Sequence, residues 1–232
     1  MTKTKFLFIV IFGLLAVADR RVHAQVTLQC ESPDLEQKDS GSVFVTPASA
    51  LETARMLQAP HGASRAGKHI LLVHWANGIH TYKDKPPYEQ LAGVLWTYCG
   101  YNPAVGFHLI RKEDVDLFTG ILLNESTGAL LPGGYSVSFS PDRQSYISWD
   151  QENGMDEGII KLYSIHGTLL WKGFSGLISQ DGKSVYPDFD SVYWNNAGKL
   201  IAEYQIPDKG KFIAILTQTK NSHWRWVSRI SK

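Results

Sequence analysis

The sequence predicts an all-β fold, in which antiparallel meanders form a sandwich or barrel, with one short helix near the N-terminus. Beyond about residue 68, short runs rich in Val, Ile, Tyr, Trp and Thr alternate with clusters of Gly, Asn, Asp and Pro, a pattern typical of antiparallel all-β chains. The turn residues are explicit enough to set strand registers. One stretch, Val137–Trp149, also returns in altered form as Val192–Tyr204. These three observations carry the prediction.

The first 24 residues have the layout of a secretory signal peptide. A basic start is followed by about thirteen apolar residues and by a polar stretch that ends at Val22-His23-Ala24. Because a bilayer span needs roughly 18 to 20 apolar residues, cleavage after Ala24 is favoured over an uncleaved anchor, and no later run is long enough to span a membrane. We therefore expect an exported chain, periplasmic or extracellular. Residues 25–68 then form an N-terminal segment with the helix, and residues 69–232 form the β domain.

The charge of the exported chain is small. The leader carries Lys3, Lys5, Arg20, Arg21 and Asp19, so 19 of the 23 basic and 21 of the 22 acidic residues remain, and the net charge changes from +1 to about −2. No basic run is longer than two residues. This composition argues against a nucleic-acid partner.

The two cysteines, Cys30 and Cys99, are expected to form a disulfide, because an exported chain meets an oxidising compartment. Closing a loop of about 69 residues should stabilise the fold by roughly 4 kcal/mol in the chain-entropy model. The alternative, a catalytic or metal-binding thiol, would call for a spacing such as CxxC, which is absent.

The one helix is predicted in the stretch SALETARMLQAP. Ser49 and Glu52 have the spacing of a capping box, and a proline ends the run. Leu51, Ala54 and Leu57 fall on one side of this helix, which is the side we expect to pack on the sheets.

Two hairpins can be assigned from their turns. Asn77-Gly78 suits a two-residue type I′ turn, because both residues tolerate positive φ. This turn places Trp75 opposite His80 and puts His74 on the other face of the hairpin. His166-Gly167 marks a second turn of the same kind.

The recurring stretch belongs to two tandem four-stranded units, at about residues 135–175 and 190–228. Aligned without a gap, the two copies pair Phe139 with Trp194. Units of four short strands with SPD-type turns and a late tryptophan resemble blades of a β-propeller. A third, fainter unit precedes them. The resemblance implies a small or incomplete propeller-like arrangement as the alternative to the sandwich or barrel.

The tryptophans are expected to pack in the core rather than to form a binding stripe. Strand alternation puts Trp224 and Trp226 on one face of their strand and Arg225 on the other.

The sequence predicts no metal site and no cofactor. The seven histidines beyond the leader show none of the usual ligand spacings. Asn124-Glu125-Ser126 has the form of a glycosylation sequon. The longest polar connection between strong strands holds Asp150, Glu152, Asp156 and Glu157. This acidic loop is the candidate interaction loop, and it lacks the ligand order of a calcium loop.

Export, one disulfide, a rigid β body and no catalytic constellation favour a binding or interaction protein over an enzyme. We expect a protein partner in the cell envelope, as for an inhibitor, an immunity-type protein or an accessory subunit. The alternative is a secreted hydrolase whose acid and base come from separate hairpins, among His74, His108, Asp114 and Asp156. The sequence does not fix the oligomeric state.

Overall fold

The computed structural model describes residues 25–30, 35–37, 43–45, 48–88, 92–115, 117–151, 158–174, 176–178, 184–206, 208–219 and 224–230. Most of these residues are in antiparallel strands, and one helix accompanies them. The predicted fold class, all-β with one short N-terminal helix, is therefore confirmed. The predicted signal peptide, residues 1–24, lies outside the described residues.

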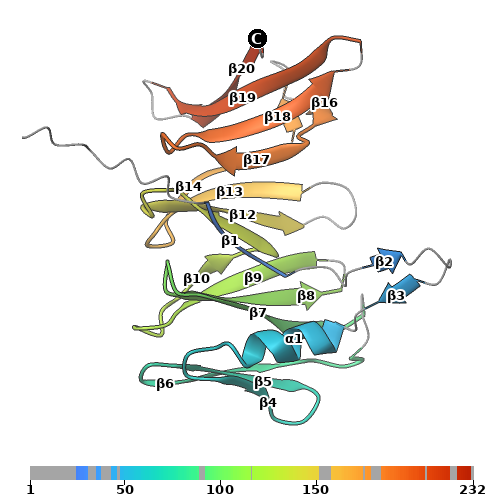
Figure 1. Ribbon diagram of the computed structural model, residues 1–232, viewed down its shortest axis with the longest axis vertical. Helices are drawn as coiled ribbons and strands as arrows, with labels where there is room; N and C mark the ends of the chain where they lie inside the picture. The colour runs from blue at the N-terminus through green and yellow to red at the C-terminus, as the bar shows by residue number, and fades with distance from the viewer. Residues whose placement is uncertain are drawn as a thin grey trace, which may run out of the picture.

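Four layers follow one another along the long axis of the molecule, in chain order except for β1, which joins the third layer (Figure 1). The first contains α1 (Ala48–Met56), β4 (Ala63–Arg65), β5 (Ile70–Trp75) and β6 (Gly78–Lys83). The second contains β7 (Val94–Asn102), β8 (Phe107–Asp114), β9 (Leu117–Asn124) and β10 (Leu130–Gly133). The third contains β1 (Val26–Gln29), β11 (Ser136–Phe139), β12 (Ser145–Gln151), β13 (Gly158–Ser164) and β14 (Leu169–Phe174). The fourth contains β17 (Ser191–Trp194), β18 (Leu200–Ile206), β19 (Gly210–Gln218) and β20 (Trp224–Ile230). Two short hairpins, β2 (Leu35–Gln37) with β3 (Val43–Val45) and β15 (Gly176–Ile178) with β16 (Ser184–Asp188), complete the described elements.

Layers two and three belong to one nine-stranded sheet that nearly closes into a barrel. On one side β12 pairs with β9 through Gln151 and Phe118. On the other side β1, which pairs with β11, is joined to β7 by the disulfide between Cys30 and Cys99, whose Cα atoms lie 4.7 Å apart. The predicted disulfide is thus confirmed, and it ties the N-terminal strand to the body of the protein.

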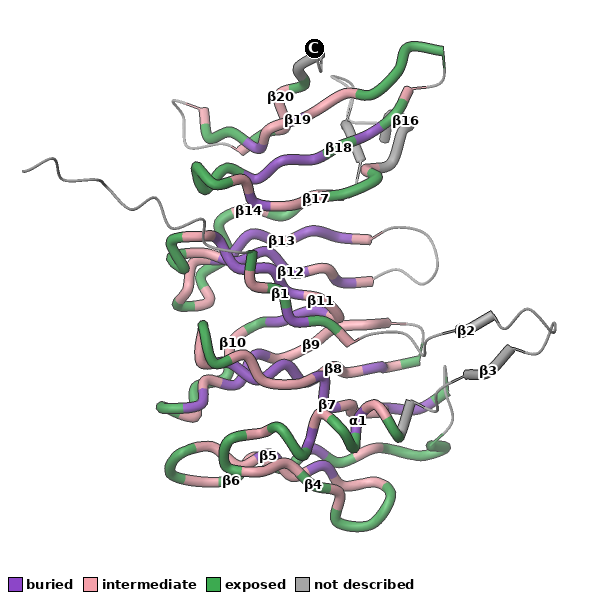
Figure 2. Tube along the Cα trace, viewed as in Figure 1, coloured by how far each residue is buried: buried purple, intermediate pink, exposed green. Residues whose placement is uncertain are grey.

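Both faces of the central layers are buried, because neighbouring residues of one strand enter different cores. Buried residues recur along the strands of these layers (Figure 2). On β8, Leu109 packs between layers two and three, and Ile110 packs between layers one and two. On β12, Tyr146 enters the core between layers two and three, and Ile147 enters the core between layers three and four. Strands buried on both faces read as nearly continuous apolar runs, and FHLI at the start of β8 is buried at all four positions.

The helix forms where it was predicted, but the predicted buried side was wrong. Leu57 is 83% exposed and Ala54 is exposed, whereas Glu52 and Met56 are buried. Met56 packs in the core between layers one and two. Glu52 is not the reciprocal partner of a capping box, because its carboxylate accepts hydrogen bonds from Arg65 and from the backbone of β7. A buried polar contact therefore outweighs the simple apolar pattern.

The β5–β6 hairpin has a different register from the predicted one. Trp75 lies opposite Gly78, and His80 lies opposite Val73, so the two turn residues are 76 and 77. The N–H of Ala76 donates to a backbone carbonyl of the neighbouring layer at 3.0 Å, which anchors the turn at this position. The shift moves the pairing by two positions, so the predicted placement of His74 and His80 on opposite faces still holds.

The two recurring stretches form equivalent hairpins, but the alignment without a gap was wrong beyond the turn. Phe139 pairs with Tyr146 in β11–β12, whereas Trp194 pairs with Leu200 in β17–β18. The second turn is therefore one residue shorter, and Leu200 takes the place of Tyr146. Each hairpin continues into a four-stranded meander, β11–β14 in layer three and β17–β20 in layer four.

Candidate functional site

The acidic loop lies mostly outside the described residues, which include Asp150 but not Glu152, Asp156 or Glu157. Asp150 is 1% exposed, and one of its carboxylate oxygens lies 2.8 Å from Nζ of Lys161 on the neighbouring strand β13. This carboxylate contributes to packing inside layer three instead of facing solvent.

The candidate acid and base residues of a hydrolase are not brought together where the structure describes them. His108 and Asp114 stand six positions apart on β8, which corresponds to about 20 Å along a strand. His74 lies on the face of β5 opposite Val73, and therefore points away from the core that Val73 enters. Asp156 lies outside the described residues.

A cluster of two imidazoles, a carboxylate and two phenols lies between layers one and two, with His108, Glu125 and Tyr98 buried and His61 exposed at its edge. His108 is fully buried on β8, where its Nδ1 lies 2.8 Å from the hydroxyl of Tyr98 and its Nε2 contacts Oε2 of Glu125. Nε2 of His61 lies 3.0 Å from Oε1 of the same carboxylate. The ring of Tyr101 packs on His108 at 4.8 Å between centroids.

This histidine–glutamate cluster stabilises the junction of the layers rather than serving as an open catalytic site. Both nitrogens of His108 have partners, and the ring is shielded from solvent, so a substrate cannot reach it. Burial lowers the pKa of His108 and outweighs the raising effect of Glu125. Burial and the Glu125 carboxylate together raise the pKa of Tyr98 and of Tyr101. The imidazole and the phenols are therefore held in their neutral forms.

A second polar network joins the same two layers. Glu52 accepts hydrogen bonds of 2.8 Å from Arg65 and from the backbone N–H of Tyr98. Asp84 accepts one of 2.8 Å from the backbone N–H of Trp96 and lies 3.5 Å from Arg65. Arg65 also donates to the Trp96 carbonyl. This network could not be predicted from the sequence, because its members come from four separate segments of the chain and share no spacing.

The outer face of the fourth layer is the candidate protein-binding surface. Strand alternation and pairing place Ile213, Ile215 and Val227 on the side of β17–β20 that faces away from layer three, together with Lys211 and Arg225. We call these five residues the end face. The three apolar residues are half-buried, and none of the hydrophobic clusters among the described residues includes them.

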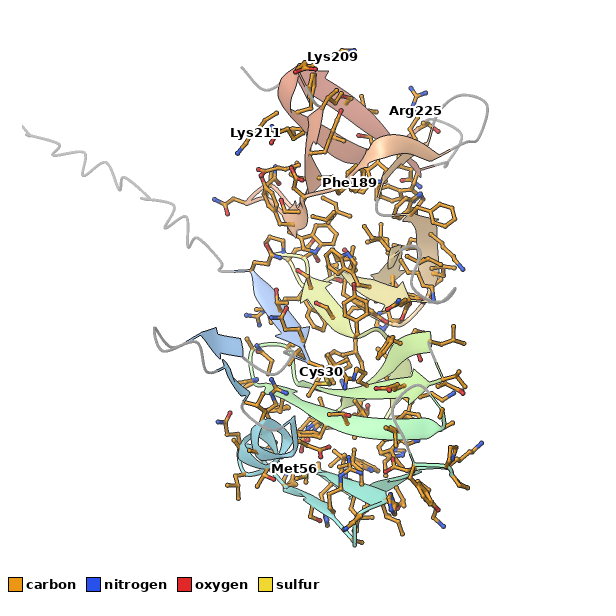
Figure 3. The ribbon with its side chains drawn as sticks, turned by 90° about the vertical axis from the view of Figure 1, so that its right-hand side faces the viewer. Cys30, Met56, Phe189, Lys209, Lys211 and Arg225 are labelled. Carbon is orange, nitrogen blue, oxygen red and sulfur yellow. A yellow bond between two sulfur atoms is a disulfide. The ribbon has the colours of Figure 1, made fainter. Side chains whose placement is uncertain are left out.

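The end face is basic at its rim, and a carboxylate beside its apolar centre, that of Glu203 opposite Ile213, accepts a hydrogen bond from the hydroxyl of Tyr193. Lys211 and Arg225 are exposed on opposite sides of the fourth layer, and Lys209 lies in the turn that precedes Lys211 (Figure 3). Within the described part of the chain, no carboxylate forms an ion pair with any of these three cations. Residues 191–232 hold seven Lys or Arg and two Asp or Glu. This local excess could have been found by counting charge along the sequence instead of over the whole chain.

The inner face of the same sheet confirms the prediction for its aromatic residues. Trp224 and Trp226 pack toward layer three, with Arg225 on the other face. Phe189 packs edge-on against Trp226, with ring centroids 4.9 Å apart, and it lies at the junction of layers three and four (Figure 3). Core packing therefore accounts for these rings.

A groove of about 440 Å³ opens between layers three and four. Its apolar walls come from Leu162 and Leu170 of layer three and from Trp194, Leu216 and Trp224 of layer four, and Lys199 contributes a cation. Ile215 and Val227 of the end face also line it. A cavity of this size and composition is typical of small-molecule sites.

Three comparisons bear on the kind of protein. No protein-family model, no curated protein and no solved structure matches this chain. Among the described residues, no group of three or more His, Cys, Asp or Glu side chains is placed to hold a metal ion. A helix that could cross a bilayer is also not found in that part of the chain, where α1 has nine residues.

Proposed function

We propose that this chain is an exported binding protein of the cell envelope, periplasmic or extracellular, that docks a protein partner on its end face. The observation that carries the proposal is the end face itself. It combines Ile213, Ile215 and Val227, which enter none of the four hydrophobic clusters, with cations that have no ion pair in the described part of the chain. The partner that fits this surface has an apolar centre and a carboxylate-rich rim.

The rest of the molecule supports a binding role through its rigidity. The central layers are packed on both faces, and a disulfide fixes the N-terminal strand. A surface on such a body is ordered before the partner arrives, so association has a lower entropic cost. Inhibitors, immunity-type proteins and accessory subunits are the classes that this behaviour suits.

Affinity capture tests the proposal when it is combined with charge reversal. The bait is the chain from Gln25 onward, the source is an envelope extract, and mass spectrometry identifies what is retained. We expect a stoichiometric partner that is lost with the double variant Lys211→Glu, Arg225→Glu and retained with the matched control Lys68→Glu, Lys83→Glu in layer one, whose lysines are also exposed. The proposal is overturned if the double end-face variant retains the partner as well as the wild type does.

Two further measurements separate this role from the alternatives. N-terminal sequencing of the chain recovered from the envelope should begin at Gln25 if export proceeds as proposed. Capture should also weaken as ionic strength rises, because the cations are exposed and screened by salt. Failure to capture any partner, together with turnover of a peptide or sugar library, would favour the hydrolase instead.

A further inference from the structure

We propose that the groove between layers three and four binds a small amphiphile with a single carboxylate head, of the fatty-acid class. This inference goes beyond the protein-binding role, because it assigns a small ligand to the space between two layers. The groove reaches the end face, since Ile215 and Val227 also contribute to its lining. Its geometry defines both parts of the ligand, an apolar tail and an anionic head.

The walls of the groove specify the tail. Leu162 and Leu216 are buried on the two facing layers, and the half-buried Trp224 and the exposed Leu170 extend the apolar wall toward solvent. The indole N–H of Trp194 donates to the carbonyl of Ser138 at 3.1 Å, so this ring offers the groove only its apolar surface. A chain of methylene groups needs no hydrogen-bond partner and fits such walls.

Lys199 specifies the head group. It is exposed at the end of the β17–β18 turn, and no ion pair engages it among the described residues. Asn195 holds this turn, because its side-chain oxygen accepts hydrogen bonds from the backbone N–H groups of residues 197 and 199, at 3.0 and 2.9 Å. The ammonium group is thus attached to a fixed turn beside the groove, where it favours a carboxylate over an uncharged head.

The lining argues against the other common small ligands. A sugar needs several hydrogen-bond donors and acceptors, whereas the polar side chains of the lining are few: Ser145, Lys199, Thr217 and Gln218. A volume of about 440 Å³ lies at the lower end of the range for small-molecule sites. This suits a medium-length chain such as decanoate.

Calorimetric titration of the full mature protein with hexanoate, octanoate and decanoate tests the tail. Each buried methylene contributes about 0.8 kcal/mol, which is roughly a fourfold gain in affinity, so each step of two carbons should tighten binding by about fifteenfold until the groove is filled. Equal affinities along the series, or the lack of saturable binding below the micellar concentration of decanoate, would overturn the proposal.

Two variants test whether the ligand binds in this groove. We expect Lys199→Ala to weaken decanoate about two- to fivefold and to leave decanol unchanged, because an exposed ion pair contributes up to about 1 kcal/mol. Lys209→Ala, at the other turn of β18, is the matched control. Leu170→Ser, at a position that is 42% exposed and tolerant of change, should weaken both ligands. Binding that is indifferent to Lys199→Ala and Leu170→Ser alike would show that the amphiphile binds elsewhere.

Discussion

Single residues determine how firmly the layers are joined, because several charged and polar side chains are buried between them. Glu52, His108, Glu125 and Asp150 are each at most 7% exposed. Each has a partner of matching chemistry in the structure. Such groups stabilise the fold only while the partner is present, and removal of one member leaves a polar atom without solvent.

His108 should make the stability depend on pH. Its pKa is lowered by burial from the ordinary value of 6.5, so the unfolded chain takes up a proton below that pH while the folded chain keeps the ring neutral. Its contribution is fully present above about pH 6.5 and is lost as the pH falls from there toward the folded-state pKa. We expect the free energy of unfolding in urea to be smaller at about pH 5.5 than at about pH 7.5.

Replacement of His108 tests whether this residue causes the pH dependence of stability. His108→Gln should reduce the dependence on pH, since glutamine does not titrate in this range. His166→Gln, in an exposed turn, is the control and should leave the dependence unchanged. If the wild type and His108→Gln lose the same free energy of unfolding between about pH 7.5 and about pH 5.5, groups other than His108 control the pH dependence of stability.

The Asp150–Lys161 pair should respond asymmetrically to substitution. Lys161→Met leaves the Asp150 carboxylate buried without its cation and should cost about 3–5 kcal/mol. The double variant Asp150→Leu, Lys161→Met replaces the pair by apolar groups and should recover most of the loss. Urea unfolding of the two single variants and the double variant gives the coupling energy. If the free-energy costs of the two single substitutions simply add up in the double variant, the proposed interaction between Asp150 and Lys161 is contradicted.

The partners of these residues were not predictable from the sequence. His61, His108 and Glu125 come from three separate segments of the chain, and their contact depends on how layer one packs on layer two. In the sequence, Glu125 is noted only as the middle residue of the sequon Asn124-Glu125-Ser126. The charge of the end face was readable in principle, because the seven basic residues between 191 and 232 are a local feature of the chain.

At the scale of elements, local signals predicted the kind of structure better than its register. The helix ends near its proline, and the strands alternate with the expected turns. The β5–β6 turn, however, is fixed by a hydrogen bond from Ala76 to another layer, and the buried side of α1 is set by Glu52 and Met56. A tertiary contact can override a local preference, because intrinsic helix and strand propensities differ by only about 1 kcal/mol per residue.

The disulfide should matter most for the first strand. β1 has four residues and pairs with β11, and its covalent link to β7 completes the nearly closed sheet. The double variant Cys30→Ser, Cys99→Ser should lose roughly 4 kcal/mol of stability in the chain-entropy model. Amide hydrogen exchange of Val26–Gln29 should accelerate more than that of Phe107–Asp114, and equal acceleration in both strands would contradict this role.

At the scale of the whole molecule, the fold class was predictable, whereas the order of the layers was not. Strand composition and turns are properties of short segments, so they are visible in one sequence. The choice between a sandwich, a barrel and a propeller-like arrangement depends on which faces meet. That choice is made by clusters that join residues of different layers, such as Leu109 with Val137 in one core and Ile147 with Trp194 in another, which no local pattern reveals.

The linear arrangement should produce a gradient of local stability. The central layers contact a neighbour on both faces, but layer four packs on layer three alone among the described residues. Native-state hydrogen exchange should therefore show lower opening free energies in β19 and β20 than in β8 and β9. Leu216→Ala, at the junction of layers three and four, should cost about 2–5 kcal/mol.

The critical observation is where along the chain hydrogen exchange accelerates in the Leu216→Ala variant. Exchange in β17–β20 should accelerate in Leu216→Ala while exchange in β8 and β9 stays near that of the wild type. A uniform acceleration throughout the chain would show that the layers open together instead of from the end.

The end face also bears on how a further sheet could be added to such a layered fold. A sheet inserted between two existing layers must satisfy both neighbours at once, whereas one added beyond Ile213 and Ile215 has to match a single surface. Duplication of a terminal unit is therefore the least disruptive route to a longer protein. The two resembling hairpins lie in the last two layers, where a copy of this kind would leave its trace.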